Sequence, residues 1–154
     1  MVKLNLSSQI VLNKVPEEFY HPKTAVELSE LTRCEKLPTT IFPKTEEGAL
    51  SIATTIANAI RQKQQSGQYC VLGLGTGSSL TPVFNELIRL HKEEKLSFSN
   101  VVVFNAYEYF PLQPSAKNST LNQLKERLLN HIDINPQNVF TLEGTVPQER
   151  VQES

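Results

Sequence analysis

The stretch that decides the fold is Val71-Leu-Gly-Leu-Gly-Thr-Gly-Ser-Ser-Leu-Thr-Pro82, in which a short apolar run stops at a cluster of glycines, serines and threonines. The run from Tyr69 to Leu74 is apolar on both faces, which is typical of a strand inside a parallel sheet. A helical pattern follows at once, so the glycine cluster is predicted to be a tight turn between strand and helix. Unpaired N–H groups and the helix dipole favour an anion there. The stretch therefore predicts an anion site, most often one for phosphate.

Apolar patterns on either side of this stretch predict an α/β domain. A helix is expected from its N-cap Thr45 to about Ser66, with Leu50 among its inward residues. A second helix follows the glycine loop, and strands are expected over residues 101–104 and 138–142, with a third helix to about residue 130 between them. This alternation predicts right-handed crossovers and a three-layer parallel sheet, with helices on both faces. Loops 75–82 and 105–118 should then share the rim formed by the carboxyl ends of the strands, where ligands bind.

Residues 1–44 differ from the rest because four prolines interrupt them (Pro16, Pro22, Pro38, Pro43). A short helix over residues 25–35 is predicted between these prolines, with Thr24 as its N-cap. We expect this segment to be an arm that packs on a core or on a neighbouring subunit, and residues 45–154 to be the α/β domain. The chain stops at Ser154 inside an amphipathic pattern over residues 146–154, so we expect the fold to be incomplete in this chain.

Composition narrows the class of protein. The net charge of −1 gives no electrostatic reason to expect binding to nucleic acid or to an acidic membrane. No run approaches the roughly 18 apolar residues of a membrane helix, and no secretory signal is visible, so a cytoplasmic protein is expected. The two cysteines, Cys34 and Cys70, are far apart and resemble ordinary intracellular thiols. The histidines show no metal-binding spacing, and neither a metal nor a cofactor is predicted.

The glycine loop matches neither of the common nucleotide-binding motifs. A dinucleotide fingerprint would need glycine at Ser78, and a Walker A loop would need Gly-Lys-Ser/Thr. Thr76, Gly77, Ser78 and Ser79 can still offer backbone N–H groups and hydroxyls to one phosphate. The alternative is a glycine turn that is needed only for a tight connection. Because the loop contains no Lys or Arg, a phosphate dianion would need a cation from elsewhere.

A second candidate follows the strand at residues 101–104, in Phe104-Asn-Ala-Tyr-Glu-Tyr-Phe-Pro111. Glu108 and the tyrosines on either side of it suit acid–base chemistry or sugar binding. A partly buried aromatic loop with a solvated glutamate explains the same residues, so both interpretations stay open.

Taken together, residues 45–149 resemble the amino-terminal half of glucosamine-6-phosphate deaminases, sugar-phosphate isomerases with a Rossmann-like fold. The loop over residues 73–82 resembles their Gly-Leu-Pro-Thr-Gly-Gly-Thr-Pro. Residues 96–105 resemble the strand before their catalytic loop, and residues 131–138 resemble their His-Val-Asp-Ile-Pro-Xaa-Xaa-Asn. The arm is similar to an extension carried by some bacterial members. A homo-oligomer is expected, because the arm can mediate subunit contacts.

The resemblance implies a ligand and a reaction. Residues Thr76 to Ser79 would bind the 6-phosphate of a phosphorylated amino sugar or hexose. The reaction would open the sugar ring, move a proton between C2 and C1, and release ammonia to give fructose-6-phosphate.

Two departures predict impaired activity. The family has Asn-Met-Asp-Glu-Tyr where this chain has Asn105-Ala-Tyr-Glu-Tyr109, so Tyr107 stands at the position of the catalytic base. A tyrosine is a poor base at neutral pH, and Glu108 could replace it only if the loop turned that side chain inward. The family's ring-opening residues and phosphate-binding Arg and Lys lie in its second half, so we expect this chain not to complete the reaction. The alternatives are a non-catalytic sugar-phosphate-binding, regulatory or assembly module, and a relative of the phosphosugar lactonases.

Overall fold

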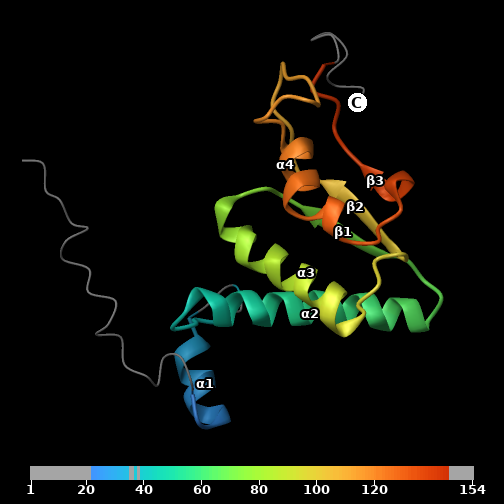
Figure 1. Cartoon of the computed structure of the whole chain (residues 1–154). Helices are drawn as coiled ribbons and strands as arrows, with labels where there is room; N and C mark the ends of the chain where they lie inside the picture. The colour runs from blue at the N-terminus through green and yellow to red at the C-terminus, as the bar shows by residue number, and fades with distance from the viewer. Residues whose placement is uncertain (1–21, 35–36, 38, 146–154) are drawn as a thin grey trace, which may run out of the picture. The chain divides into compact units, whose positions relative to one another are not determined.

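The computed structural model describes residues 22–34, 37 and 39–145, and contacts divide the chain into two units, residues 1–44 and 45–154 (Figure 1). In the first unit, helix α1 spans Ala25–Thr32. Thr24 is its N-cap as predicted: Thr24 Oγ1 accepts a hydrogen bond from the Glu27 N–H at 3.1 Å, and Glu27 Oε2 accepts one from the Thr24 N–H at 3.2 Å. This reciprocal capping box explains where α1 begins. No helix in the described part of the chain has the length and apolar character needed to cross a membrane.

Two long helices pack against each other in the second unit. Helix α2 spans Thr45–Gln65, and Gly67 follows it with a positive φ of 65°. Helix α3 spans Thr81–Glu94 and is preceded by a single 3-10 turn, η4, over Ser78–Leu80. Thr45 is the first residue of α2 rather than its N-cap. Leu50 is half exposed and Ala49 is buried in its place, because the face of α2 that packs in the core is made mainly of alanines (Ala49, Ala53, Ala57, Ile60).

The sheet is parallel, as predicted, with the order β1-β2-β3. Strand β1 spans Cys70–Leu74, β2 spans Val101–Asn105 and β3 spans Val139–Phe140. The third strand is shorter than the predicted 138–142. The further helix that the sequence predicts over residues 146–154 lies outside the described residues.

The core lies on one face of this sheet. Alternate strand residues such as Val101 and Val103 are buried in a single cluster with side chains of α2, α3 and the later helix α4 (Thr120–Arg127). The residues between them face the other way, and Val71, Phe104 and Phe140 are about half exposed or more. The rings of Phe104 and Phe140 stack there, with centroids 5.0 Å apart. The described helices of this unit therefore leave apolar side chains exposed on the second face, which the sequence predicted to be covered.

The two candidate loops leave the same end of the sheet, as predicted. The Ala106 N–H donates to the Leu74 carbonyl at 2.9 Å, so the chain after β2 stays beside the chain after β1. A loop with a cis Phe110–Pro111 bond leads to helix α4, which spans Thr120–Arg127 and is capped by Ser119. Two 3-10 turns follow, η5 over Leu129–His131 and η6 over Pro136–Asn138, before β3 begins.

Candidate functional site

The glycine loop between β1 and α3 is open to solvent. Gly77, Ser78 and Ser79 are exposed, whereas Thr76 is buried with 6% of its surface accessible. No side chain caps η4, and the backbone of Leu80 donates to the Gly77 carbonyl at 3.0 Å. The N–H groups before Leu80 are those that the first turn of a helix leaves without an intrahelical partner. N–H groups at such a position are able to bind an anion, and binding at this loop stays a prediction.

Tyr107 lies against this loop. Its hydroxyl is 3.4 Å from Thr76 Oγ1, although the two residues are 31 positions apart. A Cβ atom on Gly75 would be 3.2 Å from Tyr107 Cε1, a tight contact, so a glycine at position 75 leaves room for the ring. The structure thus brings Tyr107 together with the predicted phosphate loop.

Glu108 has different neighbours. Its carboxylate accepts hydrogen bonds at the start of α4, from the Thr120 N–H at 3.0 Å, the Leu121 N–H at 3.2 Å and the Ser119 hydroxyl at 2.8 Å. The Tyr109 N–H adds another at 2.9 Å. Burial by itself would raise the pKa of Glu108, but these hydrogen bonds outweigh it and lower the pKa to about 2. Glu108 is therefore an anion that binds a helix N-terminus, and it holds its proton very weakly.

Two further contacts attach the loop after β2 to α4. The Thr120 hydroxyl donates to the Tyr107 carbonyl at 2.6 Å and accepts from Asn105 Nδ2 at 2.8 Å. Asn105 is 5% exposed, and its Oδ1 is buried without a hydrogen-bond partner among the described residues. An orphaned buried acceptor of this kind is uncommon in proteins.

Arg127, at the other end of α4, was not predicted from the sequence. Its Nη1 donates to the Thr76 carbonyl at 2.8 Å, across 51 positions. The sequence offered only one signal for this residue, which is a cation in the last turn of a predicted helix. The helix dipole by itself favours a cation in the last turn, so this signal does not predict that Arg127 contacts Thr76.

A second polar cluster lies where the chain enters β2, at the opposite end of the sheet from the glycine loop. Asp133 accepts hydrogen bonds from the Phe98 N–H at 2.6 Å and the Ser97 hydroxyl at 2.7 Å, and His91 Nδ1 is 3.7 Å away. Burial opposes the charged form of Asp133, but these contacts lower its pKa overall. The cluster joins the loop before β2 to the segment before β3.

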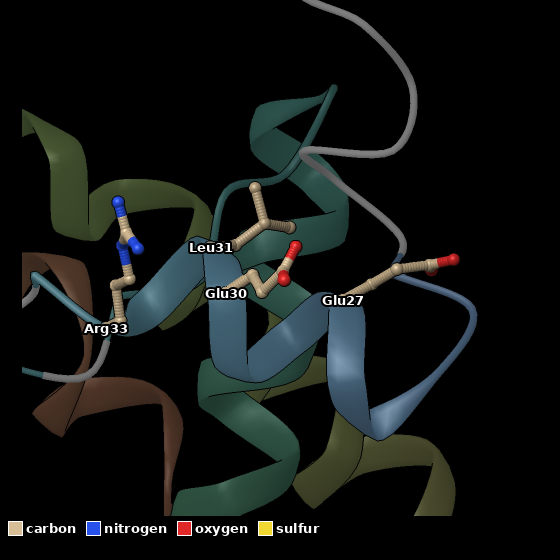
Figure 2. Close-up of a pocket in the computed structure, with 4 residues that line it drawn as sticks. All are labelled: Glu27, Glu30, Leu31 and Arg33. Atoms are coloured by element: carbon tan, nitrogen blue, oxygen red, sulfur yellow. The ribbon is translucent and has the colours of Figure 1, made fainter.

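The surface hollows lie elsewhere. Figure 2 shows one on α1, lined by Glu27, Glu30, Leu31 and Arg33. A second, of about 240 Å³, lies between α4 and β3 (Leu121, Lys125, Leu129, Asn130, Ile134, Pro136, Val139, Thr141). Neither hollow is lined by residues of the glycine loop. Within the described ranges, no cluster of three or more His, Cys, Asp or Glu side chains could hold a metal ion.

Comparisons with known proteins identify relatives. Residues 43–154 match the family described as glucosamine-6-phosphate isomerases/6-phosphogluconolactonase. A glucosamine-6-phosphate deaminase-like protein of Bacteroides thetaiotaomicron is 54% identical over 152 residues, which are 99% of this chain and 23% of that protein. Glucosamine-6-phosphate deaminase 2 of Giardia intestinalis is 44% identical over 101 residues, 66% of this chain and 37% of that one. The chain thus spans well under half the length of these relatives.

Solved structures agree on the fold. A monomeric glucosamine-6-phosphate deaminase superposes with a TM-score of 0.64 and 31% identity, over 71% of this chain and 46% of that one. The 6-phosphogluconolactonase of Trypanosoma brucei has a TM-score of 0.56 and 22% identity, over 76% of this chain and 48% of that one, which shows a shared fold alone. The family match covers most of the chain, so the chain belongs to the glucosamine-6-phosphate isomerase/6-phosphogluconolactonase family.

Proposed function

We propose that this protein binds a phosphorylated amino sugar or hexose at the glycine loop, through Thr76, Gly77, Ser78 and Ser79. The observation that carries the proposal is the uncapped helical turn with its exposed serines, at the carboxyl end of β1. The names of the relatives, which refer to glucosamine-6-phosphate deaminases, support the ligand class. A helix N-terminus with free N–H groups suits the phosphate of such a sugar.

We also propose that turnover is slow. In the deaminase reaction a base moves the C2 proton of the ring-opened sugar, and Tyr107 occupies the position of that base. A phenol is protonated at neutral pH and does not accept a proton readily. Glu108 does not replace it, because its carboxylate already accepts hydrogen bonds from Tyr109, Ser119, Thr120 and Leu121. A carboxylate with a pKa of about 2 is also a weak base.

Calorimetric titration tests the binding proposal. In the natural full-length protein, glucosamine-6-phosphate should bind and unphosphorylated glucosamine should bind much more weakly. The double variant Thr76→Ala, Ser79→Ala should lose affinity for the phosphorylated sugar. Ser51→Ala, an exposed serine on α2, is the matched control and should bind like the wild type. Equal affinity of the wild type and the double variant would remove these hydroxyls from the site.

Ammonia release tests the proposal of slow turnover. The wild type should release little ammonia from glucosamine-6-phosphate, and Tyr107→Asp should raise the rate by restoring a carboxylate at the base position. Tyr107→Phe, which lacks the hydroxyl and also lacks a carboxylate, is the control and should stay as slow as the wild type. Wild-type turnover comparable to that of an aspartate-bearing relative would contradict the assignment of Tyr107.

A second candidate function is non-catalytic binding of a sugar phosphate. The contact between the Tyr107 hydroxyl and Thr76 Oγ1 favours it, because it makes the phenol part of the loop that holds the ligand. Binding without ammonia release in both the wild type and Tyr107→Asp would support this function over the deaminase. A phosphosugar lactonase is a weaker candidate, since the lactonase structures support the fold alone.

A further inference from the structure

Among the arginines of residues 45–145, Arg127 is the one without a carboxylate partner. Arg61 pairs with Glu94 at 3.7 Å, and Arg89 lies within 3.0 Å of Glu86, Glu93 and Glu94. Arg127 is partly buried, and its described hydrogen bond goes to the Thr76 carbonyl at 2.8 Å. A partly buried guanidinium without a counter-ion is a group that gains from an anion.

We propose that Arg127 supplies a cation to the glycine-loop site from this part of the fold and binds the phosphate of the sugar ligand. This inference rests on the proposed function, because it names the charged residue of the same site. The loop contains no Lys or Arg, so neutralisation of a phosphate dianion must come from another segment. Arg127 is brought to this loop from the last turn of α4.

The geometry suits this role. A guanidinium has five N–H donors in a planar fork, and the bond to Thr76 uses one of them. That bond holds the guanidinium of Arg127 beside Thr76 in the glycine loop. Its remaining N–H donors can form a bidentate pair of hydrogen bonds with a phosphate.

The competing explanation is structural. Arg127 sits in the last turn of α4, where the helix dipole favours a cation, and its bond to Thr76 could serve only to hold the loop. If Arg127 has only a structural role, its replacement should change the stability of the protein and should weaken the binding of phosphorylated and unphosphorylated ligands alike. A phosphate-binding role would selectively change the affinity for phosphate, and would give that affinity a stronger dependence on salt.

The experiment uses the natural full-length protein and two probes, inorganic phosphate and glucosamine-6-phosphate, titrated by calorimetry. Arg127→Gln should weaken both at least tenfold, and Arg127→Lys should recover part of the loss. Arg61→Gln, which changes a partly exposed arginine on α2, is the control and should bind like the wild type. Urea unfolding of each variant separates a loss of affinity from a loss of folding.

A measurement on the wild type covers the case in which Arg127→Gln does not fold. Phenylglyoxal modifies accessible arginines, and peptide mass spectrometry locates the sites. Phosphate should protect Arg127 and leave Arg61 reactive. Unchanged affinity in a folded Arg127→Gln variant, or no protection of Arg127, would overturn the inference and leave the proposed function standing. If the wild type binds neither probe, the proposed function fails and the inference fails with it.

Discussion

Removal of the charge from Glu108 should destabilise the protein in a way that depends on pH. Its pKa falls from the ordinary value of 4.5 to about 2, which corresponds to about 3 kcal/mol of preference for the charged form in the folded protein. Because this carboxylate is only partly buried, solvent screening reduces the effect, and we expect Glu108→Gln to cost about 2 kcal/mol at pH 7. For a chain of this size that lowers the melting temperature by on the order of 5 °C.

The sign of the pH dependence follows from the direction of the shift. The folded pKa of Glu108 lies below the unfolded one, so the stabilisation is complete above about pH 4.5 and is lost as the pH falls towards 2. The gap in unfolding free energy between wild type and Glu108→Gln should therefore shrink by about a third or more between pH 7 and pH 3.5.

Urea unfolding at the two pH values measures this gap. Glu126→Gln is the matched control, because Glu126 is an exposed carboxylate on α4, the helix whose first turn Glu108 binds, and it should differ little from the wild type at either pH. Two results would refute the reasoning. The first is a Glu108→Gln variant as stable as the wild type at pH 7, and the second is a gap that is the same at both pH values.

Two other substitutions test the packing around the site and the cluster at the opposite end of the sheet. Gly144→Ala should destabilise the protein by several kcal/mol, on the order of a severe packing mutation, because a Cβ there would lie 2.7 Å from the Leu112 carbonyl oxygen. Gly73→Ala, with no atom within 4 Å of the added Cβ, is its control and should be near neutral in thermal unfolding. Asp133→Asn should cost about 1 kcal/mol, since it weakens the acceptor for the Phe98 N–H. Because the folded pKa of Asp133 is lowered, the difference should be full at pH 7 and decline in acid, and the same cost at pH 3 would exclude an electrostatic origin.

Local patterns in the sequence accounted for most of the fold. The strand at Cys70–Leu74, the turn after it and the capping residue Thr24 follow from apolar runs and from residue types that act over a few positions. The inward face of α2 was predicted less well. Periodicity favoured the large Leu50, whereas α2 buries Ala49 in the core. Which face of an amphipathic helix is buried depends on the helices and strands that pack against it, and the sequence of the helix alone does not specify those elements.

The candidate site could be predicted only in part, for the same reason. The loop residues Thr76 to Ser79 and the unusual Tyr107 were visible in the sequence, because each belongs to a contiguous motif. The partners of Glu108 lie 11 to 13 positions away at a helix N-terminus, and Arg127 reaches Thr76 across 51 positions. Such contacts depend on how α4 is placed beside the sheet, which no short-range pattern specifies.

Helix α4 forms a second connection between the two loops, in addition to the direct contact of Tyr107 with Thr76. The carboxylate of Glu108 binds its first turn, and Arg127 in its last turn holds Thr76, so eight residues of helix, about 12 Å long, act as a spacer. A helix that separates two contacts sets both the distance between them and their relative rotation about the helix axis. Insertion of one residue would lengthen it by about 1.5 Å and rotate Arg127 by about 100° relative to Glu108, which would turn the guanidinium away from the glycine loop. The helix can therefore change its surface side chains freely in evolution, whereas a change in its length would break the connection that it makes between Glu108 and Thr76.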